Sequence, residues 1–290
     1  MASALIRSLR PSQWTKNLLV FAGYLFTIGQ VHPPFTFLIV TAAFAVFCAV
    51  SGAGYLVNDV MDAERDRLHP RKRERPIASG RVSPSVGLWF AGALLVCSLT
   101  AAFVLGRGFG MVVAGYAVLT LAYSTGLKHI VIVDLLAIAA GFVLRAVAGA
   151  VVINVRISPW LLVCTTLLAL FLGLAKRRSE LVSLEEDAQN HRRTLDQYTA
   201  PMLDQMLNIS AAAALMAYFL YTFAPGSETA QHHPYMMITV PFVIYGLFRY
   251  LFLIHTVNAG ASPERVLLED RPTLVNVVLY VAAAAVALKL

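Results

Sequence analysis

Long apolar segments recur along the whole chain, and they limit its fold more than any other feature. Hydrophobic residues make up 58% of the 290 residues, and charged residues only 13%, about half the share of a soluble domain. A helix of ~20 residues crosses a ~30 Å hydrocarbon core, and most of the apolar runs are near that length. They cover residues 17–32, 35–57, 86–106, 109–127, 131–153, 159–175, 206–224, 235–256 and 272–289. Backbone polar groups in lipid must be satisfied within each segment, so the runs are expected to be helical. The sequence predicts an all-α, polytopic membrane protein with about nine transmembrane helices in a single domain, 1–290.

Basic residues predict the orientation of these helices. With nine spans, the N-terminus and every second connection fall on one side, which carries 18 Lys and Arg. The opposite side carries only three, which are Arg107, Arg156 and Lys289. Cytoplasmic connections are the ones enriched in Lys and Arg, so we expect a cytoplasmic N-terminus in the plasma (inner) membrane. The net charge of +7 is mostly this topological signal and does not indicate nucleic-acid binding.

Two long polar connections, 58–85 and 176–205, lie on the predicted cytoplasmic side and hold most of the residues capable of chemistry. The connections on the other side are short. A transporter is expected to place polar residues at the midplane and at both mouths of its pathway. The asymmetry therefore favours an enzyme whose water-soluble substrate arrives from the cytosol.

Acidic and amide side chains follow the second apolar run at helical spacing. Asn58, Asp62 and Asp66 recur every four residues, and Asp59 lies beside them. Residues four apart share one face of a helix, so the first three form a stripe at the membrane surface. A row of carboxylates at such a place requires a cation, and a hard divalent ion carrying a phosphorylated substrate suits oxygen ligands.

A basic loop follows this stripe directly. Arg65 and Arg75 are placed to bind phosphate oxygens that a metal leaves uncovered, because guanidinium groups match phosphate geometry. The run 71–73 is explained at least as well as an anchor of the cytoplasmic side.

The pattern Asn58-Asp59-x-x-Asp62-x-x-x-Asp66, followed by Arg75-Pro-Ile-Ala-Ser-Gly80, resembles the first aspartate-rich motif of the UbiA-type intramembrane prenyltransferase superfamily. The nine predicted spans agree with its helical bundle. The resemblance implies that Asn58, Asp62 and Asp66 are catalytic and, with Asp59, bind Mg²⁺ bridged to a substrate diphosphate. The segment Tyr123–Lys128 resembles that family's Tyr/Lys segment. It implies that Lys128 contacts phosphate and Tyr123 lines the cavity, although an interfacial anchor would also explain Lys128.

A second acidic motif of the family is altered in this chain. Lys176 stands where an aspartate is expected, Arg177 follows it, and Glu180 keeps the later acidic position. A base in place of an acid weakens a purely metal-centred site and provides cationic contacts to an additional phosphate. A solvated charge run is the alternative, and it suffices for Arg178.

The N-terminal motif Arg10-Pro-Ser-Gln-Trp-Thr-Lys16-Asn17, together with 172–181, resembles the decaprenyl-phosphate phosphoribosyltransferase branch of the superfamily. That resemblance implies an Mg-dependent pentosyltransferase, which transfers 5-phosphoribosyl from phosphoribosyl diphosphate (PRPP) to decaprenyl (polyprenyl) phosphate for cell-wall arabinan synthesis and releases diphosphate. Arg10, Lys16 and Asn17 are then candidate phosphate contacts. The alternative is a prenyl diphosphate:aromatic acceptor prenyltransferase of quinone or haem biosynthesis. The oligomeric state, homo-oligomer included, is open.

Two ionisable residues interrupt the apolar run 131–153. Asp134 and Arg145 are eleven residues apart, about three helical turns, and so lie near one helix face. Ionisable groups in a membrane span are expected to face the interior and to find partners there. A catalytic role and a structural network both explain the pair, and the structural reading is favoured for Arg145.

Overall fold

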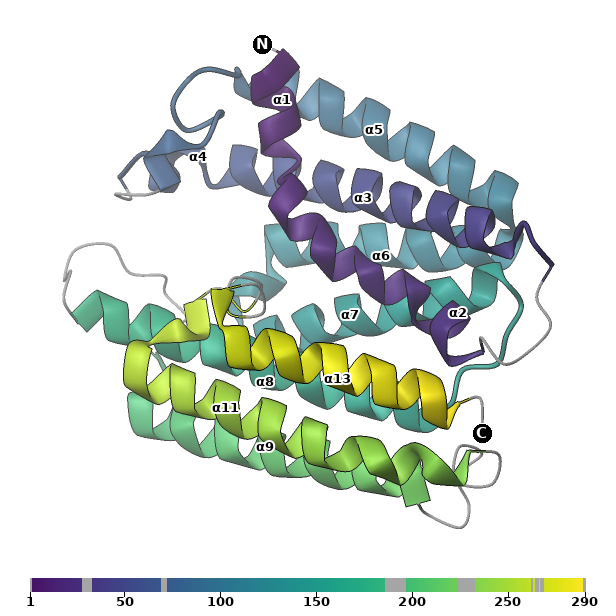
Figure 1. Ribbon diagram of the computed structural model, residues 1–290. Helices are drawn as coiled ribbons and strands as arrows, with labels where there is room; N and C mark the ends of the chain where they lie inside the picture. The colour runs from purple at the N-terminus through teal and green to yellow at the C-terminus, as the bar shows by residue number, and fades with distance from the viewer. Residues whose placement is uncertain are drawn as a thin grey trace. The chain divides into compact units, whose positions relative to one another are not determined.

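The computed structural model describes residues 2–27, 33–68, 72–185, 197–223, 233–261, 263, 266 and 269–288 (Figure 1). Within these residues every regular element is a helix. The chain divides into two compact units, Met1–Arg156 and Ile157–Leu290. The expectation of one domain stays a prediction.

Within the described part of the chain, seven helical segments are long and apolar enough to cross a membrane. They are α3 (Thr36–Met61), α5 (Pro84–Leu105), α6 (Arg107–Thr125), α7 (Val133–Val152), most of α8 (Pro159–Glu185), α9 (Ala200–Phe223), and the continuous segment of η5 (Pro234–Thr239) and α11 (Val240–Val257). A shorter apolar helix, α13, covers Arg271–Ala287. The all-α, multi-pass prediction is thereby confirmed, whereas the count of nine spans and the orientation stay predictions.

The first predicted span is where sequence and structure differ. Residues 17–26 of this span belong to a 3₁₀ helix, η1 (Pro11–Phe21), and a short α2 (Ala22–Phe26), rather than to one long α-helix, and residues 28–32 lie outside the described part. A hydropathy window counts apolar side chains and cannot detect this change in backbone winding. A further short helix, α1 (Ala2–Ser8), precedes η1.

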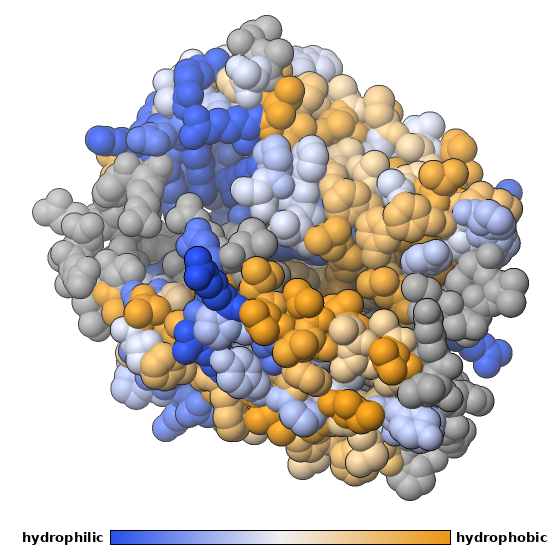
Figure 2. Space-filling view, viewed as in Figure 1, coloured by the Kyte–Doolittle hydropathy of each residue, from blue (hydrophilic) through white to orange (hydrophobic). Residues whose placement is uncertain are grey.

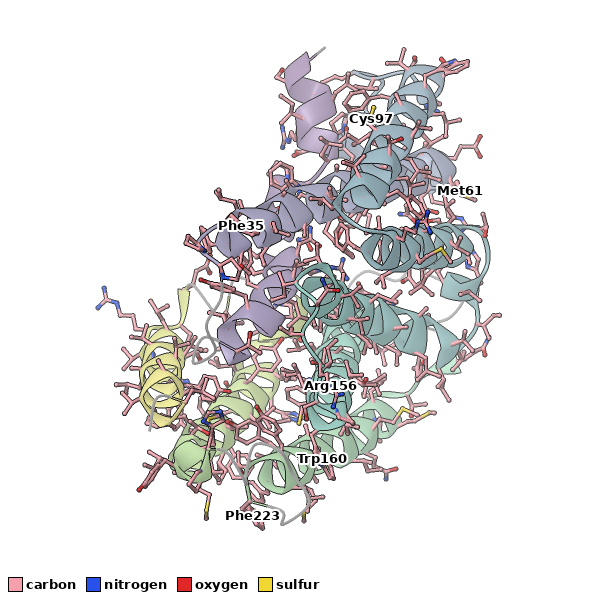
Figure 3. The ribbon with its side chains drawn as sticks, turned by 90° about the vertical axis from the view of Figure 1, so that its right-hand side faces the viewer. Phe35, Met61, Cys97, Arg156, Trp160 and Phe223 are labelled. Carbon is pink, nitrogen blue, oxygen red and sulfur yellow. The ribbon has the colours of Figure 1, made fainter. Side chains whose placement is uncertain are left out.

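The core of the first unit lies between α3, α6 and α7. Its largest wholly buried side chains are Phe47 and Phe109, whose rings lie 6.1 Å apart, with Val40 and Val113 beside them. Figure 3 labels Phe35 and Met61 at the two ends of α3, the helix against which α5, α6, α7 and η1 pack. Burial of such aromatic and branched side chains fixes how α3 lies in the unit.

The outer surface of the first unit is apolar along α5. Trp89 and Val104, near the two ends of this helix, are more than four-fifths exposed. Exposed apolar side chains over a whole helix length are expected where lipid is the solvent. Figure 2 shows the hydrophilic side chains of this unit gathered instead around α4 (Ala63–Leu68) and the adjoining end of α3.

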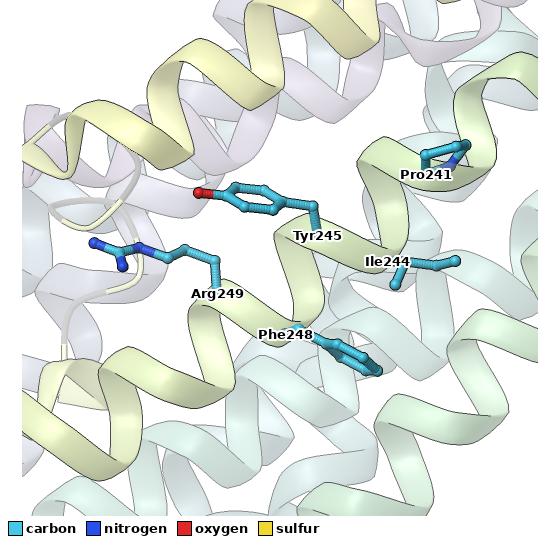
Figure 4. Close-up of a pocket in the computed structure, with 5 residues that line it drawn as sticks. All are labelled: Pro241, Ile244, Tyr245, Phe248 and Arg249. Atoms are coloured by element: carbon cyan, nitrogen blue, oxygen red, sulfur yellow. The ribbon is translucent and has the colours of Figure 1, made fainter.

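In the second unit, α8 packs along α9, and α11 packs along α13. Asp270 caps α13, because its Oδ2 accepts a hydrogen bond from the backbone N–H of Thr273 at 3.0 Å. One face of α11 carries an open hollow of about 520 Å³, lined by Pro241, Ile244, Tyr245, Phe248 and Arg249 (Figure 4).

Candidate active site

The acidic stripe begins where α3 ends. Met61 is the last residue of α3, Asp62 caps it, and α4 follows at once. The backbone N–H of Asp62 still donates to the carbonyl of Asn58 at 2.9 Å, and that of Asp66 to the carbonyl of Asp62 at 2.8 Å. The four-residue spacing therefore continues through the junction between the two helices.

One part of the cluster is centred on Lys128. This residue lies in the short 3₁₀ helix η3 (Leu127–His129) and is 2% exposed. Its ammonium donates to Oδ1 of Asp62 at 2.8 Å and to Oδ1 of Asn58 at 3.2 Å. The amide of Asn58 in turn donates to Oδ2 of Asp62 at 3.1 Å. Two members of the predicted metal stripe thus share one buried cation.

The other part of the cluster joins the two buried carboxylates. Arg75 places its Nη1 2.5 Å from Oδ2 of Asp66 and 3.1 Å from Oδ1 of Asp59. Asp59 also accepts a hydrogen bond from Nη2 of Arg10. Asp59 and Asp66 are 2% and 4% exposed, so both carboxylates depend on these guanidinium groups for charge balance.

Arg75 is held by the loop that follows it. The side chains of Ile77 and Val82 are buried in a core cluster that includes Leu56 of α3. The loop closes through hydrogen bonds from the N–H of Ser79 to the carbonyl of Arg75 at 2.8 Å and from that of Val82 to the carbonyl of Pro76. The folded Pro-Ile-Ala-Ser-Gly segment thus holds the side chain of Arg75 toward Asp59 and Asp66.

Arg10 reaches the site from the N-terminal segment. Its backbone has φ 52°, in the left-handed region that costs a residue with a side chain about 1–2 kcal/mol. Its guanidinium carbon lies 4.9 Å from the ring centre of Tyr55 on α3, a cation–π contact. Tyr55 and the backbone of Arg10 were not singled out by the sequence, because both depend on how the N-terminal segment crosses α3.

Comparison with known proteins agrees with this geometry. Residues 17–268 match the UbiA prenyltransferase family. The chain belongs to this family. The UbiA membership predicted from the aspartate-rich motif is therefore confirmed.

Curated relatives cover nearly the whole chain. A decaprenyl-phosphate phosphoribosyltransferase of Mycolicibacterium smegmatis is 36% identical over 281 residues, which cover 93% of this chain and 88% of that protein. The protein of the same name from Corynebacterium glutamicum is 35% identical, covering 93% and 82%. A solved UbiA homologue from Archaeoglobus fulgidus, bound to GPP and Mg²⁺, superposes with a TM-score of 0.74 at 18% identity over 99% of this chain and 100% of that one. The last likeness establishes the fold.

Most of the first UbiA motif is gathered in one cluster, and four other predicted residues of the same unit differ in how far they are buried. Arg65 is exposed, while Lys16 and Tyr123 are partly exposed on η1 and at the end of α6. Asn17 is wholly buried, and its amide donates to Oγ of Ser51 at 3.2 Å. The functional groups of Asn17 are therefore taken by other parts of the protein.

The altered second UbiA motif lies on α8 in the second unit. Lys176 is exposed, whereas Arg177 is 2% exposed and its Nη1 lies 2.6 Å from Oε2 of Glu180. Arg178, expected to be solvated, instead donates from Nε to Oδ1 of Asp204 on α9. This correction was not foreseeable from α8 alone, because the partner belongs to another helix.

The donor atoms of the first motif fit Mg²⁺ in kind. The carboxylates of Asp59, Asp62 and Asp66 and the amide oxygen of Asn58 are the hard oxygen ligands this ion prefers. Among the described residues no three acidic, His or Cys side chains are arranged to hold a metal. The three carboxylates are instead balanced by three cations, Arg10, Arg75 and Lys128. An arriving dication and its accompanying diphosphate would keep such a cluster close to neutral.

Proposed function

We propose that this UbiA protein is a decaprenyl-phosphate phosphoribosyltransferase, which transfers 5-phosphoribosyl from PRPP to decaprenyl phosphate and releases diphosphate. The observation that carries the proposal is the 33–36% identity to proteins of that name over 93–99% of the chain. The acidic and basic cluster at the end of α3 supports it, because a sugar diphosphate requires both metal ligands and phosphate-binding cations.

Asn58, Asp59, Asp62 and Asp66 are the residues that would hold Mg²⁺. When bound, the ion would supply Lewis-acid stabilisation of the charge on the departing diphosphate. Support comes from the oxygen donor set described above and from the solved A. fulgidus homologue, which is bound to Mg²⁺.

The cationic side chains of the cluster have a separate task. Lys128 and Arg75 donate to the acids at 2.8 Å and 2.5 Å, and the same donors suit the phosphate oxygens of the donor substrate. These two cations, already held in place by the acids, would stabilise the negative charge that develops on the departing diphosphate.

The reaction itself needs little covalent help from the protein. An oxygen of the lipid phosphate attacks C1 of the ribose, and the C1–O bond to diphosphate breaks with both electrons leaving on the diphosphate oxygen. The lipid phosphate is already anionic at neutral pH, so no general base is required. Direct attack inverts C1, and positioning and electrostatics supply the rate.

The 5-phosphate of the donor requires further cations. We assign Lys176 and Arg177 to this group, with Glu180 orienting Arg177 through their 2.6 Å ion pair. Arg10 and Lys16 are assigned to phosphate as well, shared between donor and lipid. We place the protein in the plasma membrane with its active site facing the cytoplasm. Its lipid product would serve cell-wall arabinan synthesis.

The test is an assay with purified protein in lipid nanodiscs. We expect Mg²⁺-dependent release of diphosphate when both PRPP and decaprenyl phosphate are present, and formation of the phosphoribosylated lipid. A parallel reaction supplies a prenyl diphosphate and an aromatic acid. Diphosphate release in that reaction, with none from PRPP, would make the aromatic prenyltransferase the correct function.

A further inference from the structure

Arg145 is a buried cation that the proposed reaction does not use. It lies on α7 with 6% of its surface exposed, and it has no carboxylate partner among the described residues. Its Nε donates to Oδ1 of Asn17 at 2.7 Å, Nη2 to the hydroxyl of Tyr116 at 2.7 Å, and Nη1 to the carbonyl of Gly141. Burying a charged guanidinium among neutral groups costs free energy, so we expect Arg145 to hold neighbouring elements in position.

Asn17 connects Arg145 to α3. Its amide donates to Oγ of Ser51 at 3.2 Å, while its carbonyl oxygen is held by Arg145. Asn17 belongs to η1, so one side chain joins η1, α3 and α7. In Figure 1 the N-terminal segment between the labels α1 and α2 crosses in front of α3.

A second link between η1 and α3 lies at the acidic cluster, where Arg10 donates to Asp59. Arg10 and Asn17 are seven residues apart, about 14 Å along a 3₁₀ helix at ~2.0 Å per residue. Ser51 and Asp59 are eight residues apart, about 12 Å along an α-helix at ~1.5 Å per residue. The two links therefore match in spacing, with η1 running antiparallel to α3.

Close backbone packing on the α7 side sets how near η1 and α2 lie to α7. A Cβ added at Gly149 of α7 would collide with the carbonyl oxygen of Val20, and one added at Gly23 would lie 2.9 Å from Cα of Ala150. The position of η1 along α3 is defined instead by the directional hydrogen bonds of Asn17 to Ser51 and Arg145. The position of Arg10 next to Asp59 therefore depends on the buried hydrogen bonds of Asn17.

We propose that Arg145 is a positioning residue of the active site: through Asn17 it fixes the register of η1 on α3, and so holds Arg10 against Asp59. The inference rests on the proposed function, because the consequence is measured as binding of the diphosphate donor. It gives the buried arginine and the buried asparagine a common role that neither has alone.

The experiment compares Arg145→Met, Arg10→Ala and the double variant, by KM and kcat for PRPP. Each single change is expected to raise KM about tenfold, as loss of a charge-assisted hydrogen bond does, with a smaller change in kcat. The double variant should be no worse than Arg10→Ala. Tyr116→Phe is the matched control, since it removes one partner of Arg145 and leaves the Asn17 link. Independent effects of Arg145→Met and Arg10→Ala on KM would overturn the proposal.

A second measurement is independent of turnover. Trp14 lies in η1, and its indole donates to the carbonyl of Leu9. With Trp89 and Trp160 changed to Phe, Trp14 is the remaining tryptophan of the three. We expect Arg145→Met, but not Tyr116→Phe, to shift its emission, and an unchanged spectrum would refute the register mechanism even if the protein proved inactive with PRPP. Should Arg145→Met not fold, Asn17→Asp keeps an acceptor for Arg145, removes the donor to Ser51, and should give the same shift.

Discussion

Lys128 and Asp62 are 66 positions apart in the sequence, yet Nζ of Lys128 lies 2.8 Å from Oδ1 of Asp62. The same ammonium contacts Oδ1 of Asn58. These two oxygens are among those expected to bind Mg²⁺, so the lysine and the ion compete for the same lone pairs. Under the proposed function, the diphosphate that accompanies the ion would give the lysine an alternative partner.

Replacement of Lys128 should therefore have opposite effects on the two ligands. In Lys128→Met, free Mn²⁺, as a probe for Mg²⁺, should bind about tenfold more tightly, the effect of one like charge removed from a partly buried site. The KM for PRPP should rise, because a phosphate contact is lost. Electron paramagnetic resonance measures the first and steady-state kinetics the second.

Arg65→Met provides the control for the Lys128 experiment. This exposed residue carries the same charge near the same helix end without a described role in the cluster. If both variants tightened Mn²⁺ binding equally, the effect would be one of net charge, and the shared-oxygen account would be wrong.

Asp62→Asn tests the acidic motif itself. The amide preserves shape and still accepts a hydrogen bond from Lys128, but it removes the negative charge that a dication requires. We expect kcat to fall by about 10²–10³, the scale seen when one preorganised electrostatic group is lost. The Mg²⁺ concentration for half-maximal rate should rise. Glu64→Gln, an exposed acid two residues further on in α4, should leave both values unchanged. Near-normal turnover of Asp62→Asn would remove Asp62 from the metal site.

Local spacing made the acidic motif predictable. Asn58, Asp62 and Asp66 follow an apolar run at intervals of four, and the i to i+4 hydrogen bonds that keep this spacing are a property of the helix alone. The contacts made by Arg10 and Lys128 were not predictable in this way. Their partners are 49 and 66 residues distant. Only tertiary packing, of η1 on α3 and of η3 on α6 and α7, brings them together.

The role of Asn17 shows a second limit of the sequence. As a polar residue near a basic motif it suggested a phosphate contact, yet its side chain is wholly buried against α3 and α7. Polarity in a motif does not reveal whether a side chain faces a ligand or another helix, because burial is decided by tertiary packing. The 3₁₀ winding of 11–21 escaped the hydropathy pattern for another reason, because that pattern records apolar side chains and not the winding of the backbone.

Replacing either of two glycines by alanine is expected to change the stability of the protein, with opposite signs at the two positions. Gly80 has φ +77° and open space around it, so Gly80→Ala adds only backbone strain and should cost about 1 kcal/mol. Gly92 also has open space but lies within α5, where alanine is favoured over glycine by about 1 kcal/mol. Thermal unfolding in detergent should therefore show a lower midpoint for Gly80→Ala and a higher one for Gly92→Ala. Equal shifts for both would contradict the left-handed turn at Gly80.

Asp270 predicts a pH dependence of stability in the second unit. Arg249 donates to both carboxylate oxygens, at 3.2 Å and 2.8 Å. Chiefly for this reason, with help from Thr273, the pKa of Asp270 lies well below its usual value. As pH falls, the unfolded chain takes up this proton first, near pH ~3.9, so the stabilisation is complete above that pH and declines below it toward the lower native pKa.

Asp270→Asn should therefore unfold at a lower temperature than the unchanged protein at neutral pH, with the difference shrinking below about pH 4. Glu269→Gln, an exposed neighbouring acid, controls for the loss of one negative charge and should show no comparable trend. Asp270 also caps α13, but the asparagine side chain still serves as a cap, so the helix start is retained in the variant. The pH-dependent part is thus specific to the ion pair with Arg249, and a difference that stayed constant from neutral pH to about pH 3 would show that the pair contributes nothing to stability.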